Sequence, residues 1–105
     1  MRKLQREIHD NAKAHGWWDE PRTFGDVIAL CHSELSEALE SFRNGEPFFW
    51  TGEDGKPEGV GVELADCIIR ILDYAGSVDI DMAELVRKKH EYNKTRPYRH
   101  GGKAL

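Results

Sequence analysis

Hydrophobic residues recur three and four positions apart along most of the chain, the spacing typical of amphipathic helices. The clearest run starts after Thr23, a capping residue followed three positions later by Asp26, and ends at Asn44-Gly45. One continuous stripe holds its apolar residues: Phe24, Val27, Ile28, Cys31, Leu35, Ala38, Leu39 and Phe42. The pattern predicts a helix of about five turns between these signals.

The same spacing predicts two further helices, one on each side of this run. The first covers about residues 2–15 and stops before Gly16. The other has Pro57 in its first turn, runs to about Tyr74 and ends at Gly76. Its apolar residues occupy almost the whole circumference, which is typical of a buried helix.

A last helix is expected to be capped by Asp79 or Asp81 and to stop before Pro97. Residues 45–56, rich in glycine and proline, are expected to form a loop. The fold class is therefore all-α: a single domain over residues 1–105, with a four-helix core. A chain this short buries a modest core, so we expect the helical bundle to be completed by dimerisation.

Charge and composition restrict the classes of partner and the cell compartment that we expect for this protein. The formal net charge of −4 argues against nucleic acid or an anionic membrane, both of which reward a basic surface. No apolar run approaches the length of a membrane span, and no secretory signal is visible at the N-terminus, so a cytoplasmic protein is expected. Cys31 and Cys67 lie within helical patterns and are interpreted as reduced core residues.

Charged residues interrupt the most apolar helix along a single line. Glu63, Asp66, Arg70 and Asp73 are spaced by three or four residues, so they share one face. Burying carboxylates without partners costs on the order of several kcal/mol each. The line therefore needs either a bound cation or a structural network of ion pairs around Arg70, and the sequence leaves both possible.

The preceding helix carries a second acidic pair, Glu34 and Glu37, also three residues apart. If the two helices pack antiparallel, this pair meets Glu63 and Asp66. Four carboxylates select hard cations, so Mg²⁺, or Mn²⁺ in its place, is the expected occupant.

The last helix changes character along its inward face. The apolar positions of its first turns are followed at the same spacing by Lys89, Asn93 and Arg96, which are candidates for phosphate binding. Capping of the helix C-terminus is the structural alternative, above all for Arg96. The tail adds further positive charge, either as a lid over phosphate or as a mobile end: Arg99, His100 and Lys103.

These motifs resemble the MazG-type nucleotide pyrophosphohydrolases of the all-α NTP pyrophosphatase superfamily. The similar segments are Ser33-Glu34-Leu35-Ser36-Glu37, Glu63-Leu64-Ala65-Asp66 and residues 89–96. The resemblance implies a Mg²⁺-dependent enzyme that hydrolyses an NTP or dNTP to the monophosphate and pyrophosphate, as a homodimer or a homotetramer of dimers. It assigns Glu34, Glu37, Glu63 and Asp66 to the metal, and Lys89, Asn93 and Arg96 to phosphate. Ser33 departs from the pattern, because many members have a glutamate there.

The expected reaction is attack of a metal-oriented water on the α-phosphorus, with Glu34 or Glu37 accepting the proton. Trp17, Trp18 and Trp50 are candidates for the nucleobase wall, although core packing also explains the first two. Two alternatives stay open: a non-catalytic helical interaction module, and a hydrolase of another pyrophosphate-containing nucleotide derivative.

Overall fold

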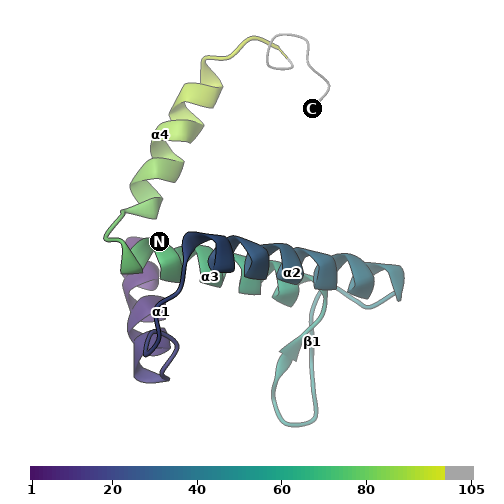
Figure 1. Ribbon diagram of the computed structural model, residues 1–105. Helices are drawn as coiled ribbons and strands as arrows, with labels where there is room; N and C mark the ends of the chain where they lie inside the picture. The colour runs from purple at the N-terminus through teal and green to yellow at the C-terminus, as the bar shows by residue number, and fades with distance from the viewer. Residues whose placement is uncertain (99–105) are drawn as a thin grey trace.

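A computed structural model describes residues 1–98, which form four helices and one short hairpin (Figure 1). The helices are α1 (Arg2–Ala14), α2 (Phe24–Arg43), α3 (Val60–Ser77) and α4 (Met82–Lys94). Strands β1 (Trp50–Thr51) and β2 (Pro57–Glu58) pair antiparallel between α2 and α3. The all-α class is confirmed. None of the described helices is long and apolar enough to cross a membrane.

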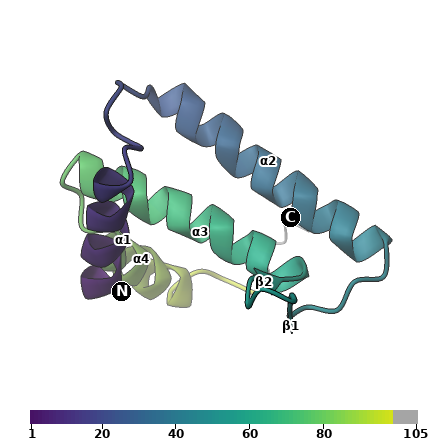
Figure 2. The ribbon, with the colours of Figure 1, turned by 90° about the horizontal axis from the view of Figure 1, so that it is seen from below.

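Helices α2 and α3 lie side by side and run antiparallel, and they form the centre of the structure (Figures 1 and 2). Val27, Cys31 and Cys67 are buried between them, with Tyr74 packed against this group. Both cysteines are free thiols, as the sequence predicts. The predicted start of α2 is confirmed, because Thr23 Oγ1 accepts from the Asp26 amide at 3.0 Å and the Thr23 amide donates to Asp26 Oδ2 at 3.1 Å.

The start predicted for α3 is wrong, because Pro57 belongs to β2 and the helix begins at Val60. Gly59 separates the two elements with a φ of 119°, a conformation that L side chains rarely adopt. A Cβ atom there would lie 2.5 Å from the Phe48 carbonyl oxygen. The predicted loop over residues 45–56 therefore includes β1 of a hairpin held against the start of α3.

The predicted end of α3 is also wrong, since Gly76 lies inside the helix and Ser77 is its last residue. Helix α1 crosses α3 at this point, and a Cβ on Gly76 would come within 2.7 Å of the His9 side chain. The glycine therefore serves close packing of two helices and does not end one. Sequence alone gives no sign of this, because the neighbour is 67 positions away.

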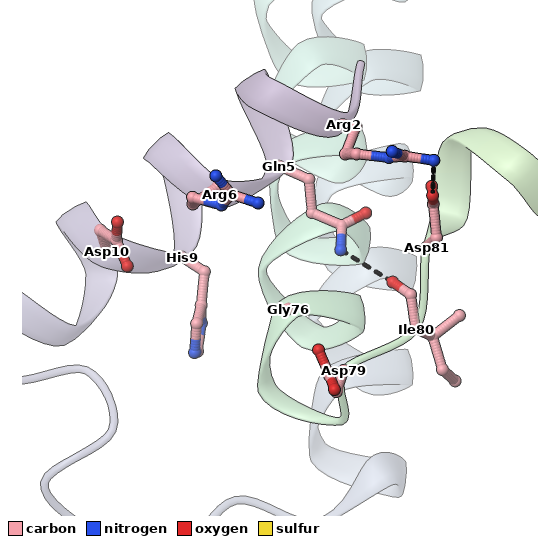
Figure 3. A pocket seen from close by; sticks show the side chains of 9 residues that line it. All are labelled: Arg2, Gln5, Arg6, His9, Asp10, Gly76, Asp79, Ile80 and Asp81. Carbon is pink, nitrogen blue, oxygen red and sulfur yellow. Dashed lines mark hydrogen bonds and ion pairs between the residues drawn. The ribbon is translucent and has the colours of Figure 1, made fainter.

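A polar junction fixes the start of α4 against α1 (Figure 3). The Gln5 side chain donates to the Ile80 carbonyl at 2.8 Å and accepts from the Met82 amide at 3.2 Å. Asp81 pairs with Arg2 and caps α4 by accepting from the Glu84 amide at 3.1 Å. Of the two predicted caps, Asp81 is the one the structure uses. Beyond this junction α4 stands away from α2 and α3 (Figure 1).

Many large hydrophobic side chains are exposed on the described part of the chain. On α2 the exposed residues recur at helical spacing, opposite the flank that carries Glu37, and α3 continues the surface. We call this the apolar face, and its members are Phe24, Ile28, Leu35, Leu39 and Phe42 of α2 with Leu64, Ile68 and Ile71 of α3. On α4, Leu85 and Val86 are exposed as well.

Candidate metal centre

Three of the predicted carboxylates meet where α2 and α3 run side by side. One carboxylate oxygen from each of Glu34, Glu37 and Glu63 lies within 4.8 Å of the other two, and we call these residues the glutamate cluster. Glu34 is buried, Glu63 is half-buried and Glu37 is exposed. Antiparallel packing brings them together because Glu34 and Glu37 share one flank of α2 while Glu63 stands in the first turn of α3.

Asp66 lies one turn further along α3 and outside the group of oxygens that meet within 4.8 Å. Burial raises the pKa of its carboxyl, and the negative charge of Glu34 raises it further. The nearby positive charges of Arg70 and Lys56 act in the opposite direction. Asp66 therefore lies in the electrostatic field of the glutamate cluster. The structure brings three of the four predicted metal ligands together, and Asp66 is the fourth.

Burial and the repulsion between the carboxylates of the glutamate cluster both change the pKa of Glu63. Burial, followed by a hydrogen bond with Glu37 and the charges of Glu37, Asp66 and Glu34, raises the pKa of Glu63 to about 7. Near neutral pH the carboxyl group of Glu63 is therefore partly protonated. A divalent cation would replace that proton and offset the repulsion, since oxygen ligands suit Mg²⁺ and Mn²⁺.

We expect Mg²⁺ to bind more tightly as the pH rises through about 7, because the cation must displace the Glu63 proton. Without metal, the stability of the folded state changes with pH in the opposite direction and falls as the pH rises. The folded state keeps this proton at a pH where the unfolded carboxyl has lost it, so raising the pH from about 4.5 through about 7 removes stability. Titration calorimetry at pH 6, 7 and 8 in buffers of different ionisation enthalpy measures both affinity and proton release. An affinity that is constant over this range, with no proton released, would contradict the assignment.

Arg70 supplies the ion pair that the sequence left as an alternative to metal. Its Nε donates to Glu34 Oε1 at 2.9 Å, and its guanidinium carbon lies 5.1 Å from the centre of the Trp17 ring. On that ring Arg22 also stacks, at 3.6 Å from the centre. Ion pairing and carboxylate clustering therefore coexist at Glu34.

A cavity of about 560 Å³ opens beside the glutamate cluster, between α1 and α3. Asn11, His15 and Trp17 line one side, and Glu34, Asp66 and Arg70 line the other. Its size and mixed lining are typical of a site for a small organic ligand. Asn11 and His15 both line this cavity on the side of α1.

The other two tryptophans lie in different surroundings. Trp18 donates from Nε1 to both oxygens of Asp73, at 2.9 and 3.1 Å, and His9 Nδ1 lies 2.8 Å from Asp73 Oδ1. Asp73 is only 6% exposed, so this network satisfies a buried carboxylate and ties the loop after α1 to α3. Trp50 lies on the hairpin, where its Nε1 donates to Glu46 Oε1 at 3.3 Å.

The predicted phosphate-binding residues are not brought to the glutamate cluster within one chain. The cavity and Glu34 lie on the side of α3 that faces α1, whereas α4 extends away from α2 and α3 in the opposite direction (Figure 1). Lys89 and Arg96 instead flank the Tyr92 ring, at 5.0 and 6.0 Å from its centre, and Asn93 is exposed. The basic residues of the tail lie outside the described residues: Arg99, His100 and Lys103.

Two basic residues near the site were missed by sequence reasoning. Lys56 precedes β2, and its charge reaches Asp66 only because the hairpin folds beside α3. Arg22 precedes the capping residue of α2, and its Nε donates to the Trp17 carbonyl at 3.0 Å. Neither sits at a helical spacing that would have singled it out.

The donor set has a defined chemistry. Carboxylate oxygens without a histidine or thiolate among them favour a hard divalent ion, and the adjoining cavity has room for a small organic ligand. Comparisons with known proteins add no neighbour: no family model matches the chain, and neither does any curated protein or solved structure.

Proposed function

We propose that this protein is a Mg²⁺-dependent nucleoside triphosphate pyrophosphohydrolase of the MazG type, whose acidic motifs it resembles. One observation carries the proposal: oxygens of Glu34, Glu37 and Glu63 meet within 4.8 Å beside a cavity of about 560 Å³. A cation would offset the mutual repulsion of these carboxylates, which supports a metal site. Two buried free thiols and a nucleotide substrate fit a cytoplasmic location.

Mg²⁺ at this site would supply Lewis-acid polarisation and a more acidic water. Glu34, Glu37 and Glu63 would hold the ion, with Asp66 completing the set. Glu34 is engaged by Arg70, so the exposed Glu37 is better placed to accept the proton from the attacking water. Displacement at the α-phosphorus releases pyrophosphate and leaves the monophosphate.

The nucleoside would occupy the cavity between α1 and α3. Trp17 offers an aromatic wall there, while Asn11 and His15 offer polar groups that could hydrogen-bond a base edge. Trp18 is committed to Asp73, so we do not assign it to the base. Trp50 stays a candidate only if the hairpin contacts the substrate.

A second copy of the chain would complete the protein. The apolar face and the exposed Leu85 and Val86 offer a surface that a second copy could cover, and large contiguous apolar patches mark interaction sites. Because α4 stands apart, its Lys89, Asn93 and Arg96 would reach phosphates in an assembled dimer and not within the isolated chain. We therefore propose a homodimer as the smallest active unit, with a tetramer of dimers as a further possibility.

Product analysis tests the reaction. Each common NTP and dNTP is incubated with the protein and Mg²⁺, and pyrophosphate and orthophosphate are measured separately. We expect pyrophosphate and the monophosphate, and no turnover when the metal is chelated. Orthophosphate as first product would mean attack at the γ-phosphorus and refute the proposed reaction. No turnover of any nucleotide would favour an interaction module, and cleavage of other nucleotide pyrophosphates alone would favour the second alternative.

A further inference from the structure

Arg70 stands at the junction between the glutamate cluster and the cavity. Its side chain is 28% exposed, and that of its partner Glu34 is 10% exposed. The Nε–Oε1 distance of 2.9 Å is that of a charge-assisted hydrogen bond. Both residues also line the cavity, together with Trp17, against which the guanidinium lies.

This contact has a specific consequence for Glu34. Of the three clustered glutamates it is the most buried, and it faces Glu37 and Glu63 at close range. Repulsion from like charges would drive its side chain to another conformation unless a positive group held it. The guanidinium is planar and donates in a fixed direction, so it holds one oxygen and leaves the rest of the carboxylate for other partners.

We propose that Arg70 is a positioning residue of the metal centre: its Nε–H holds Glu34 in the conformation that meets Glu37 and Glu63. The inference rests on the proposed function. It goes further by naming the group that organises the ligands before the metal arrives.

Two other roles for Arg70 predict different results. A purely structural ion pair would lower thermal stability when removed and leave metal affinity unchanged. A competitor that occupies the site in place of the ion would give tighter metal binding when removed. Metal affinity therefore separates the three roles by its direction.

The test replaces Arg70 by glutamine and uses Arg22→Gln as a matched control. Both variants remove a guanidinium from the Trp17 ring, but only Arg70→Gln removes the contact with Glu34. Calorimetry with Mg²⁺ alone, and with Mn²⁺ alone, should show affinity weakened about 10- to 100-fold in Arg70→Gln. The Mg²⁺ concentration that half-saturates hydrolysis should rise by a similar factor. Arg22→Gln should keep both values within about twofold of the wild type, the range expected when no ligand is touched.

Arg70→Lys provides a second measurement in case the glutamine variant does not fold. It keeps the charge but loses the planar donor, so its affinity for Mg²⁺ should be weaker than that of the wild type. Wild-type or tighter binding in Arg70→Gln, or in Arg70→Lys where the glutamine variant does not fold, would overturn the inference. If the wild type binds Mg²⁺ but hydrolyses no nucleotide, the proposed function fails while calorimetry still decides the role of Arg70. If the wild type binds no Mg²⁺, both fail.

Discussion

Replacing Glu63 by glutamine is expected to lower Mg²⁺-dependent kcat/KM at least about 100-fold, since loss of a ligand should cost no less than loss of an outer partner. The amide keeps the size of the side chain but removes a charge that the cation needs. It also removes the group whose pKa is raised to about 7, so the metal-free variant should be at least as stable as the wild type at pH 8. Steady-state kinetics and thermal unfolding without metal measure the two effects.

The matched control for this variant is Glu40→Gln, which removes an exposed carboxylate from α2 outside the glutamate cluster. It should leave kcat/KM within about twofold of the wild type, because substitutions of exposed residues away from a binding site or a buried network have small effects. Hydrolysis by Glu63→Gln at the rate of this control would contradict the assignment of Glu63 to the metal. Loss of activity accompanied by unfolding would contradict the predicted stability.

A lysine in place of Ile68 is expected to convert the protein to a monomer and to abolish its activity. Ile68 is 53% exposed and lies in the apolar face. In a symmetric dimer the substitution occurs twice, and each buried, unpaired charge costs on the order of several kcal/mol. Sedimentation equilibrium at micromolar concentration measures the change in mass. Activity should fall with the dimer, because Lys89, Asn93 and Arg96 would lose access to a site.

Ala29→Lys is the control for the interface, since it adds the same charge at an exposed position of α2 away from the apolar face. This variant should sediment and hydrolyse as the wild type does. A wild-type protein that sediments as a monomer and is active would refute the dimer. It would also leave the three α4 residues without a part in phosphate binding.

Local signals determine the elements that the sequence predicts well. The start of α2 is set by two side chains three residues apart, and its end by Asn44-Gly45, so both can be read from the chain alone. The acidic pairs could likewise be placed on helix faces by spacing, and the antiparallel arrangement of α2 and α3 then brings Glu34 and Glu37 to Glu63. Here periodicity and topology are sufficient.

Features that depend on distant neighbours could not be predicted. Gly59 and Gly76 have roles set by Phe48 and His9, whereas the sequence signals placed the start of α3 at Pro57 and its end at Gly76. The sequence could not show whether Trp18 packs within the protein or contacts a ligand, because its hydrogen bonds to Asp73 depend on a residue far along the chain.

The position of the candidate phosphate-binding residues likewise could not be predicted from the sequence. On α4 the row that begins with Met82 and continues to Lys89 has the pattern of an inward face. That pattern says which residues share a side, and it cannot say whether the side is covered by the same chain or by a second copy. In the described chain α4 stands apart from α2 and α3, which is why we propose that a second copy covers this side (Figure 1).

The most direct test locates the cation itself. Crystals grown with Mn²⁺ are measured at its absorption edge, and the anomalous difference map gives the position of the ion. We expect a peak about 2.0–2.2 Å from oxygens of Glu34, Glu37 and Glu63, distances usual for small hard divalent ions. A map without a peak between α2 and α3, at a Mn²⁺ concentration that supports hydrolysis, would contradict the account.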